Sequence, residues 1–407
     1  MIASMTSGSN ALAEANAPSW NELEAHTEAP DWFRDAKFGI YAHWGLYSIP
    51  EFKSEWYPRW MHVDGKGYKE YHQETYGADF HYHDFIPMFT ADKFDAEEWA
   101  ELYQRAGAKF AGPVGEHHDG FAMWDSAHTP FNAADMGPKR DIVGELEQAI
   151  RARGMKFMMS FHHSYNPSFL EYAKDPLYSS DKYAPMYGKL PREEFTQMWS
   201  AKLKESIDQY NPDLMWFDFG LGGISSEAVR DYLDYFFTNT DDAVLTFKNK
   251  KWKGVSIEQL RRIGIEDFER GRLNKLTEYA WLTDDSITDG SWSFTKGIRV
   301  KPQEYVLHVL IDIVSKNGQL LLNIAPKADG TIPQDQKDVL YYVGDWLKQY
   351  GESIYGTRPF VDFGEGPTRL EKSGHFLKEM SFTPQDIRYT TKGNTVYAIL
   401  LGRPEAG

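Results

Sequence analysis

Asp218 closes an apolar run, Leu-Met-Trp-Phe at 214–217, and a glycine-containing stretch follows it. The run has the composition of a buried strand, where a carboxylate without partners is costly. One interpretation is structural, with Asp218 capping a helix or paired to an Arg or Lys of the same fold. The other is chemical, because sugar hydrolases need a carboxylate beside an aromatic platform, which Trp216 supplies. We favour the chemical interpretation.

His117 and His118 form the second candidate group, in Glu-His-His-Asp-Gly-Phe at 116–121. Side chains alternate along a strand, so a regular strand would direct only one of the two imidazoles toward a common site. The Asp-Gly that follows predicts that the strand has already ended, which would admit both. The alternative is one core histidine and one exposed histidine. We expect neutral imidazoles that exchange hydrogen bonds with sugar hydroxyls.

Further histidines raise the alternative of a metal-dependent barrel hydrolase. They are His81 and His83, and the adjacent pair His162 and His163. Against this alternative, His81 and His83 fall in a polar loop, and the carboxylate ligands of such enzymes are not evident. We therefore expect no metal and no cofactor.

Glu55 and Trp56 occur together in Ser-Glu-Trp-Tyr, in a loop that follows the first predicted strand. A surface loop with a packed tryptophan is the structural interpretation. In the functional one, Glu55 accepts hydrogen bonds from hydroxyls while Trp56 covers an apolar sugar edge.

Short apolar runs alternate with longer stretches of helical period, which is typical of a parallel α/β barrel or sheet. Neither a dinucleotide-binding glycine motif nor a phosphate-binding loop is present, and the unit count favours a (β/α)8-like TIM barrel. His43, His117, His162 and Asp218 each stand at the carboxyl end of a predicted strand, and in a barrel these ends meet at one mouth. The predicted strands span 37–45, 109–120, 156–164, 214–220, 243–247, 278–283 and 319–326, and the predicted helices 95–108, 141–154, 192–210, 226–238, 302–318 and 334–356.

The pattern changes near residue 358 to short alternating stretches, which predict antiparallel strands at 375–383, 386–391 and 394–402. About 50 residues are few for an independent sandwich, so a partial or complete β-sandwich and a clasp on the barrel both stay open. The predicted domains are a flexible N-terminal segment at 1–28, a catalytic domain at 29–356 and a C-terminal β domain at 357–407.

The composition excludes several classes of partner. The 407 residues carry a formal net charge of -16, which repels nucleic acid and anionic membranes. Cysteine is absent, so disulfides and thiolate nucleophiles are excluded. No apolar stretch reaches the roughly 18 residues of a membrane span, and the N-terminus lacks an export signal. We expect a soluble protein, cytoplasmic unless a signal was removed, of unspecified oligomeric state.

Five segments, taken together, resemble the α-L-fucosidases of glycoside hydrolase family 29, in order and over roughly residues 30–360. They are AHWGLYSIPEFKSEWY, EHHDGFAMWDS, GPKRDIVGEL, NPDLMWFDFG and LLLNIAPKADGTIP with GESIYGTRPF. The resemblance implies a (β/α)8-like catalytic domain, a C-terminal β-sandwich, no cofactor, and retaining hydrolysis of terminal α-L-fucose from a fucosylated glycan. It makes Asp218 the nucleophile, and it assigns sugar contacts to His43, Glu55, Trp56, His117, His118 and Trp216.

The acid/base is less clearly marked. Leu282 stands where many family members have an acid, while the upstream segment Ile-Glu-Asp-Phe-Glu resembles one where other members carry it. We choose Glu269 there, with Glu266 as the second choice, although an acidic loop in solvent is the structural alternative. The missing acid at 282 also keeps open a fucose-binding protein without catalysis.

Two other positions depart from the family pattern. His162 or His163 stands in place of a tyrosine contact to the sugar. Lys248 is the nearest cation where an arginine often occurs. We expect these changes to affect affinity and leaving-group preference more than the reaction.

Overall fold

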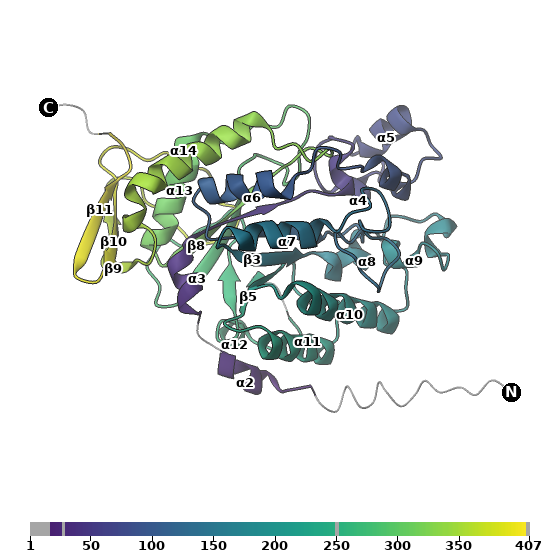
Figure 1. Ribbon diagram of the computed structural model, residues 1–407, viewed down its shortest axis with the longest axis horizontal. Coiled ribbons are helices and arrows are strands. Elements are labelled where there is room, and N and C mark those ends of the chain that lie inside the picture. The colour runs from purple at the N-terminus through teal and green to yellow at the C-terminus, as the bar shows by residue number, and fades with distance from the viewer. Residues whose placement is uncertain (1–16, 27–28, 249–251, 404–407) are drawn as a thin grey trace.

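A computed structural model describes residues 17–26, 29–248 and 252–403 of the chain. Its centre is a closed barrel of parallel strands, hydrogen-bonded in sequence order, with the last strand paired to the first (Figure 1). The barrel confirms the predicted fold class. Its strands are β1 (Phe38–Ala42), β2 (Phe110–Glu116), β3 (Lys156–Phe161), β4 (Leu214–Phe217), β5 (Val244–Lys248), β6 (Ile265–Asp267), β7 (Trp281–Ser286) and β8 (Gly318–Ile324).

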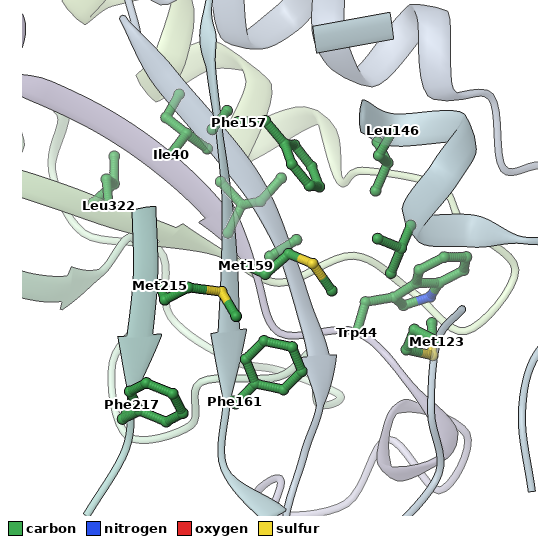
Figure 2. Close-up of a cluster of buried hydrophobic side chains, with 14 of the residues drawn as sticks. Ile40, Trp44, Met123, Leu146, Phe157, Met159, Phe161, Met215, Phe217 and Leu322 are labelled. Carbon is green, nitrogen blue, oxygen red and sulfur yellow. The ribbon is translucent and has the colours of Figure 1, made fainter. Parts of the chain in front are cut away.

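Alternation along the strands sorts the buried side chains into two cores. In β4, Met215 and Phe217 point outward and pack in the layer between the barrel and its helices (Figure 2). Leu214 and Trp216 belong to the cluster that fills the barrel interior. Asp218 is next in the inward series, so strand geometry places its carboxylate at the mouth of the barrel.

The helices that surround the barrel begin where the sequence places capping residues. The side chain of Asp95 accepts a hydrogen bond from the amide of Glu98, and that of Ser225 from the amide of Ala228. The longer helices are α5 (Tyr68–Tyr76), α6 (Ala96–Arg105), α7 (Ile142–Ala152), α10 (Arg192–Tyr210), α11 (Ser226–Asn239), α13 (Gln303–Ser315) and α14 (Gln334–Tyr350). The shorter ones are α2 (Trp20–Leu23), α3 (Asp31–Ala36), α4 (Tyr57–Trp60), α8 (Asn166–Phe169), α9 (Ala184–Tyr187) and α12 (Ile257–Leu260).

Among the strands, three segments differ from the expectation, and one of them is residues 358–365, which form a strand where none was expected. Residues 265–267 form β6, which has only three residues, two of them acidic, so a search for apolar runs could not find it. Residues 375–383, expected to be a strand, have no regular secondary structure. The reason is that the amides of Phe376 and Leu377 donate to carbonyls of residues 269 and 270 near β6, instead of to a neighbouring strand.

The C-terminal part is a three-stranded antiparallel sheet in the order β11-β10-β9. Its strands are β9 (Arg358–Glu365), β10 (Ile387–Lys392) and β11 (Thr395–Leu400). The sheet lies beside α13 (Figure 1). The predicted domain limits at 28/29 and 356/357 stay predictions. Of the segment 1–28, residues 17–26 are described and bury Trp20 and Leu23, whereas residues 1–16 and 27–28 lie outside the described part.

No helix in the described ranges is both long enough and apolar enough to span a bilayer.

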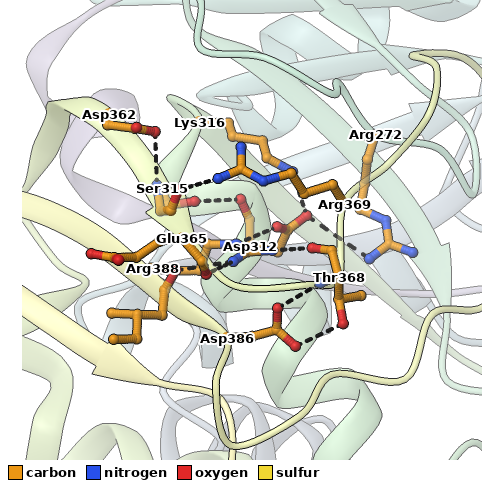
Figure 3. Close-up of polar contacts among 12 residues, drawn as sticks. Arg272, Asp312, Ser315, Lys316, Asp362, Glu365, Thr368, Arg369, Asp386 and Arg388 are labelled. Carbon is orange, nitrogen blue, oxygen red and sulfur yellow. Dashed lines mark hydrogen bonds and ion pairs between the residues drawn. The ribbon is translucent and has the colours of Figure 1, made fainter.

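A buried charge network joins the sheet to the barrel (Figure 3). Asp312 on α13 accepts from Arg388 Nε of β10 at 2.7 Å and from Lys316 Nζ at 2.7 Å, and Arg272 lies 4.0 Å away. Burial alone would raise the pKa of Asp312, but these three cations outweigh it and lower the pKa to about 2. The carboxylate is therefore ionised and is the common partner of charges from three segments.

We predict that Asp312→Ala lowers the free energy of unfolding by about 3–5 kcal/mol, because it leaves buried cations without their partner. Urea denaturation measures the change, with Asp241→Ala, an exposed acid, as the control that stays within about 0.5 kcal/mol of the wild type. A wild-type urea midpoint in Asp312→Ala would contradict the role given to this network.

Candidate active site

A cavity of about 450 Å³ opens at the carboxyl ends of the barrel strands. The side chains that were first choices from the sequence all line it, although they come from separate elements. They are His43, Glu55, Trp56, His117, His118, His162, Trp216, Asp218 and Glu269. Because β2 ends at Glu116, both His117 and His118 enter the cavity. His163 does not line it and instead packs toward Trp199 on the outer side of the barrel.

Asp218 is held by cationic and imidazole groups. Its Oδ1 accepts from Lys248 Nζ at 2.7 Å, and its Oδ2 lies 3.1 Å from His118 Nε2 and 3.3 Å from His162 Nδ1. Burial alone would raise the pKa of Asp218, but the Lys248 charge and the two histidines outweigh it and hold the pKa well below its usual value. The carboxylate is therefore ionised, and its side chain keeps 10% of its surface exposed toward the cavity.

Lys248, the last residue of β5, lies between the two candidate catalytic carboxyls. Its Nζ donates to Glu269 Oε2 at 2.7 Å as well as to Asp218, and it lies 3.6 Å from Asp284 Oδ2. Burial would lower the pKa of this lysine, but the surrounding carboxylates, led by Asp218, raise it well above its usual value. Lys248 is therefore charged, and its ammonium forms a bridge between the carboxyls of Asp218 and Glu269.

Glu269 lies two residues after the end of β6, and 12% of its side-chain surface is exposed. Its backbone amide donates to His375 Nδ1 at 3.0 Å. Burial raises the pKa of Glu269; Lys248 opposes that rise, whereas Asp284 and Asp218 add to it. A carboxyl with a raised pKa beside an ionised carboxylate is the arrangement that an acid and a nucleophile require.

Glu266, the second choice from the sequence, points away from the cavity. It follows the inward-facing Ile265 in β6, and its Oε2 accepts from Arg261 Nε at 2.7 Å. Strand alternation therefore separates Glu266 from Glu269.

Asp267 and Asp284 form a buried acidic pair beneath the bridge. Asp267 Oδ1 accepts from the Asp284 amide at 2.9 Å, and its Oδ2 accepts from Trp216 Nε1 at 3.2 Å. Burial, with the neighbouring Asp284 charge, raises the pKa of Asp267 well above its usual value. This shift favours the protonated form of Asp267, so the pair places less than two full negative charges beside Lys248.

Three histidines of the cavity, His43, His117 and His162, are neutral. Burial lowers the pKa of His43 and of His117 well below the usual value, and it lowers that of His162 to about 4 against the attraction of Asp218. Asn323 Oδ1 lies 2.8 Å from His43 Nδ1 and accepts a hydrogen bond from the Nδ1–H group, which leaves Nε2 of that ring as an acceptor. Neutral rings of this kind suit hydroxyl recognition. Nitrogens of His43, His117 and His162 also lie within 4.8 Å of one another, a spacing that a metal ion could use.

Aromatic side chains form the cavity wall. Trp56 lies almost parallel to Trp60, with ring centroids 6.0 Å apart. Glu55 is buried beside Trp56 and accepts from the Trp292 amide at 2.8 Å, so it ties the first loop to the loop after β7. Burial raises the pKa of Glu55, with hydrogen bonds from Trp292 and Ser291 opposing the shift.

Several lining residues were not selected from the sequence. Asp284 could have been found, because it stands two positions beyond Leu282 and so shares its inward face. Phe376 could not, because it comes from the C-terminal segment about 100 residues after Glu269. The full set is Tyr41, Ser54, Trp60, Phe219, Arg270, Asp284, Gly290, Trp292 and Phe376.

A closed parallel barrel with two adjacent carboxyls at its mouth, one ionised and one of raised pKa, has the site of a (β/α)8-barrel glycoside hydrolase. Comparison with known proteins identifies the group within that class. The alpha-L-fucosidase family model matches residues 3–352, and the chain belongs to this family.

Individual alpha-L-fucosidases are similar to this chain over most of its length. The tissue alpha-L-fucosidase of Rattus norvegicus is 32% identical over 399 residues, which cover 96% of this chain and 80% of that protein. The plasma alpha-L-fucosidase of Homo sapiens is 32% identical over 403 residues, covering 96% and 79%. A crystal structure of Thermotoga maritima alpha-fucosidase in complex with fucose superposes with a TM-score of 0.77 at 31% identity, covering 95% of this chain and 86% of the other.

We predict that Lys248→Met moves both limbs of the pH profile of kcat/KM upward. With Asp218 as the assigned nucleophile and Glu269 as the assigned acid, activity would require Asp218 ionised, above its pKa, and Glu269 protonated, below its pKa. Because the ammonium lowers both pKa values, its loss raises both, and the acid limb shifts by about 1–3 pH units. Lys253→Met, at an exposed lysine, serves as the matched control. If the acid limb of Lys248→Met stays where it is in the wild type, the role given to the Lys248 ammonium in lowering the pKa of Asp218 is wrong.

Proposed function

We propose that the chain is a retaining exo-α-L-fucosidase that hydrolyses terminal α-L-fucose from fucosylated glycans through a fucosyl intermediate on Asp218. One observation carries the proposal: Lys248 Nζ lies 2.7 Å from an oxygen of Asp218 and 2.7 Å from one of Glu269. The two oxygens can therefore be no farther apart than twice that distance. This agrees with the separation of about 5–5.5 Å in retaining enzymes and is shorter than the about 6.5–9.5 Å of inverting ones.

In the first step, Asp218 attacks the anomeric carbon while Glu269 gives its proton to the leaving glycosidic oxygen. The bond between sugar and Asp218 forms as the glycosidic bond breaks. As negative charge leaves Asp218, Lys248 and His118 lose a partner, and Lys248 remains available to the newly ionised Glu269. The fixed cation thus stabilises whichever carboxylate bears the charge.

In the second step, Glu269 takes a proton from water, which attacks the anomeric carbon from the face that the leaving group vacated. The bond to Asp218 breaks, fucose departs with its original configuration, and both carboxyls return to their starting states. Asp218 must leave as a stable carboxylate. Its lowered pKa supports that role.

Sugar recognition falls to the histidines and the aromatic wall. We assign hydroxyl contacts to His43, His117, His118, His162 and Glu55, and apolar contacts with the sugar ring or methyl group to Trp56 and Trp216. A methyl pocket distinguishes fucose from a hydroxymethyl sugar only modestly by contact alone. A cavity of about 450 Å³ at the barrel mouth suits one terminal sugar.

Paired azide experiments test the two carboxyl assignments separately, with 4-nitrophenyl α-L-fucoside as substrate. We expect Asp218→Ala to lose activity by about 10⁴-fold or more. Azide should then replace the nucleophile and give β-L-fucosyl azide. In Glu269→Ala the loss should be about 10²–10⁴-fold. Azide should attack the fucosyl-enzyme there and give α-L-fucosyl azide.

Glu266→Ala is the matched control, because its carboxylate faces Arg261 outside the cavity; we expect no azide product from it. Full turnover by Asp218→Ala would contradict the nucleophile assignment. Failure of the wild type to release nitrophenol while binding fucose would favour a binding protein instead.

A metal-dependent hydrolase is the second candidate, and the spacing of His43, His117 and His162 is the observation that favours it. The two-carboxyl mechanism has no step that uses a metal. We therefore expect the wild type to keep its kcat/KM after prolonged dialysis against EDTA. Activity lost to the chelator and restored by Zn²⁺ would favour the metal-dependent reaction.

A further inference from the structure

The segment 371–377, which precedes β10, pairs with the acid/base loop at 269–274. Arg272 and Gly374 exchange two backbone hydrogen bonds, at 3.1 and 3.2 Å. The Phe376 amide donates to the Glu269 carbonyl at 2.8 Å, and the Leu377 amide donates to the Arg270 carbonyl at 3.0 Å. With the bond from the Glu269 amide to His375, these contacts attach the C-terminal region to the residue that we assign as acid/base.

Phe376 has two unusual properties for its position. It is 65% exposed although it is large and apolar, and it lines the active-site cavity. Its φ of 50° lies in the left-handed region, which a bulky side chain adopts at a cost. The backbone pairing on either side keeps the residue in this conformation, and the exposed ring covers no core.

The position of Phe376 relative to Glu269 defines which part of a substrate it can meet. The acid must reach the glycosidic oxygen, so the leaving sugar has to lie beside Glu269. The hydrogen bond between the two backbones places Phe376 next to that acid, whereas the groups assigned to fucose lie around Asp218. Trp60 is a further aromatic side chain of the same cavity.

We propose that Phe376 is the platform of an aglycone subsite, on which the pyranose that leaves stacks with its apolar face. The inference rests on the proposed function and extends it to the sugar that the enzyme releases. Aromatic rings bind such faces through apolar area and C–H contacts with the π system. The C-terminal segment therefore contributes substrate selectivity, and does so through a ring attached to the acid/base loop.

The test compares a substrate that has an aglycone sugar with one that has none. The first is whichever of the α1→2, α1→3, α1→4 and α1→6 fucosyl disaccharides the wild type hydrolyses best. The second is α-L-fucosyl fluoride, whose leaving group reaches no platform. The quantity compared is the kcat/KM for the disaccharide divided by the kcat/KM for the fluoride. For Phe376→Ala we expect this ratio to fall by roughly 3- to 10-fold, the effect of one aromatic contact.

The variant keeps the backbone amide that donates to Glu269, so the pH profile for fluoride hydrolysis should stay that of the wild type. Phe376→Trp should hold or raise the ratio. Val361→Ala, at an apolar side chain that is 89% exposed on β9, is the control and should leave the ratio unchanged.

Three results would overturn the inference. An unchanged ratio in Phe376→Ala would show that the ring meets no aglycone. An equal loss on both substrates, or a shifted pH profile, would show that Phe376 only positions the acid/base loop. Failure of the wild type to hydrolyse fucosyl fluoride is a separate outcome that would refute the proposed function, and with it the subsite.

Discussion

The ammonium of Lys248 is the interaction on which the site depends. Asp218, Glu269 and Asp284 all approach this one buried cation, and Asp267 lies directly behind them. Two carboxyls this close would repel each other if both were ionised without compensation. The cation allows Asp218 to keep its charge, while burial and the remaining acids favour a proton on Glu269. The division of roles that we propose for two chemically similar side chains therefore follows from where one charge lies.

The barrel provides that arrangement by strand alternation. Inward positions at the ends of β4, β5 and β7 deliver Asp218, Lys248 and Asp284 to a common centre. Acids at neighbouring outward positions pair with cations outside the cavity: Asp285 of β7 accepts from Lys301 Nζ at 2.7 Å, and Glu266 of β6 accepts from Arg261 Nε. The very short β6 ends early, which leaves Glu269 in a loop. That loop then needs external support, and the segment around His375 supplies it through backbone hydrogen bonds.

The sequence was most informative where a residue's position in a strand determines its direction. Asp218, His117 and His118 could be assigned to one mouth, because a barrel brings all carboxyl ends together. Prediction failed where the outcome depends on long-range pairing. In the segment 375–383, expected to be a strand, the amides of Phe376 and Leu377 donate to carbonyls of the loop at 269–274 instead of to a neighbouring strand. The strand β6 is too short and too acidic to be found as an apolar run. No local pattern predicts that Phe376 enters the cavity, because the contact joins segments about 100 residues apart.

The stereochemistry of the first product tests most directly whether two carboxyls held by Lys248 operate as nucleophile and acid/base. Proton NMR during the earliest turnovers of 4-nitrophenyl α-L-fucoside identifies the anomer before mutarotation mixes the two forms. We predict that α-L-fucose appears first, with the β anomer growing in later. Release of β-L-fucose first would mean a single displacement by water, and it would contradict a nucleophilic Asp218.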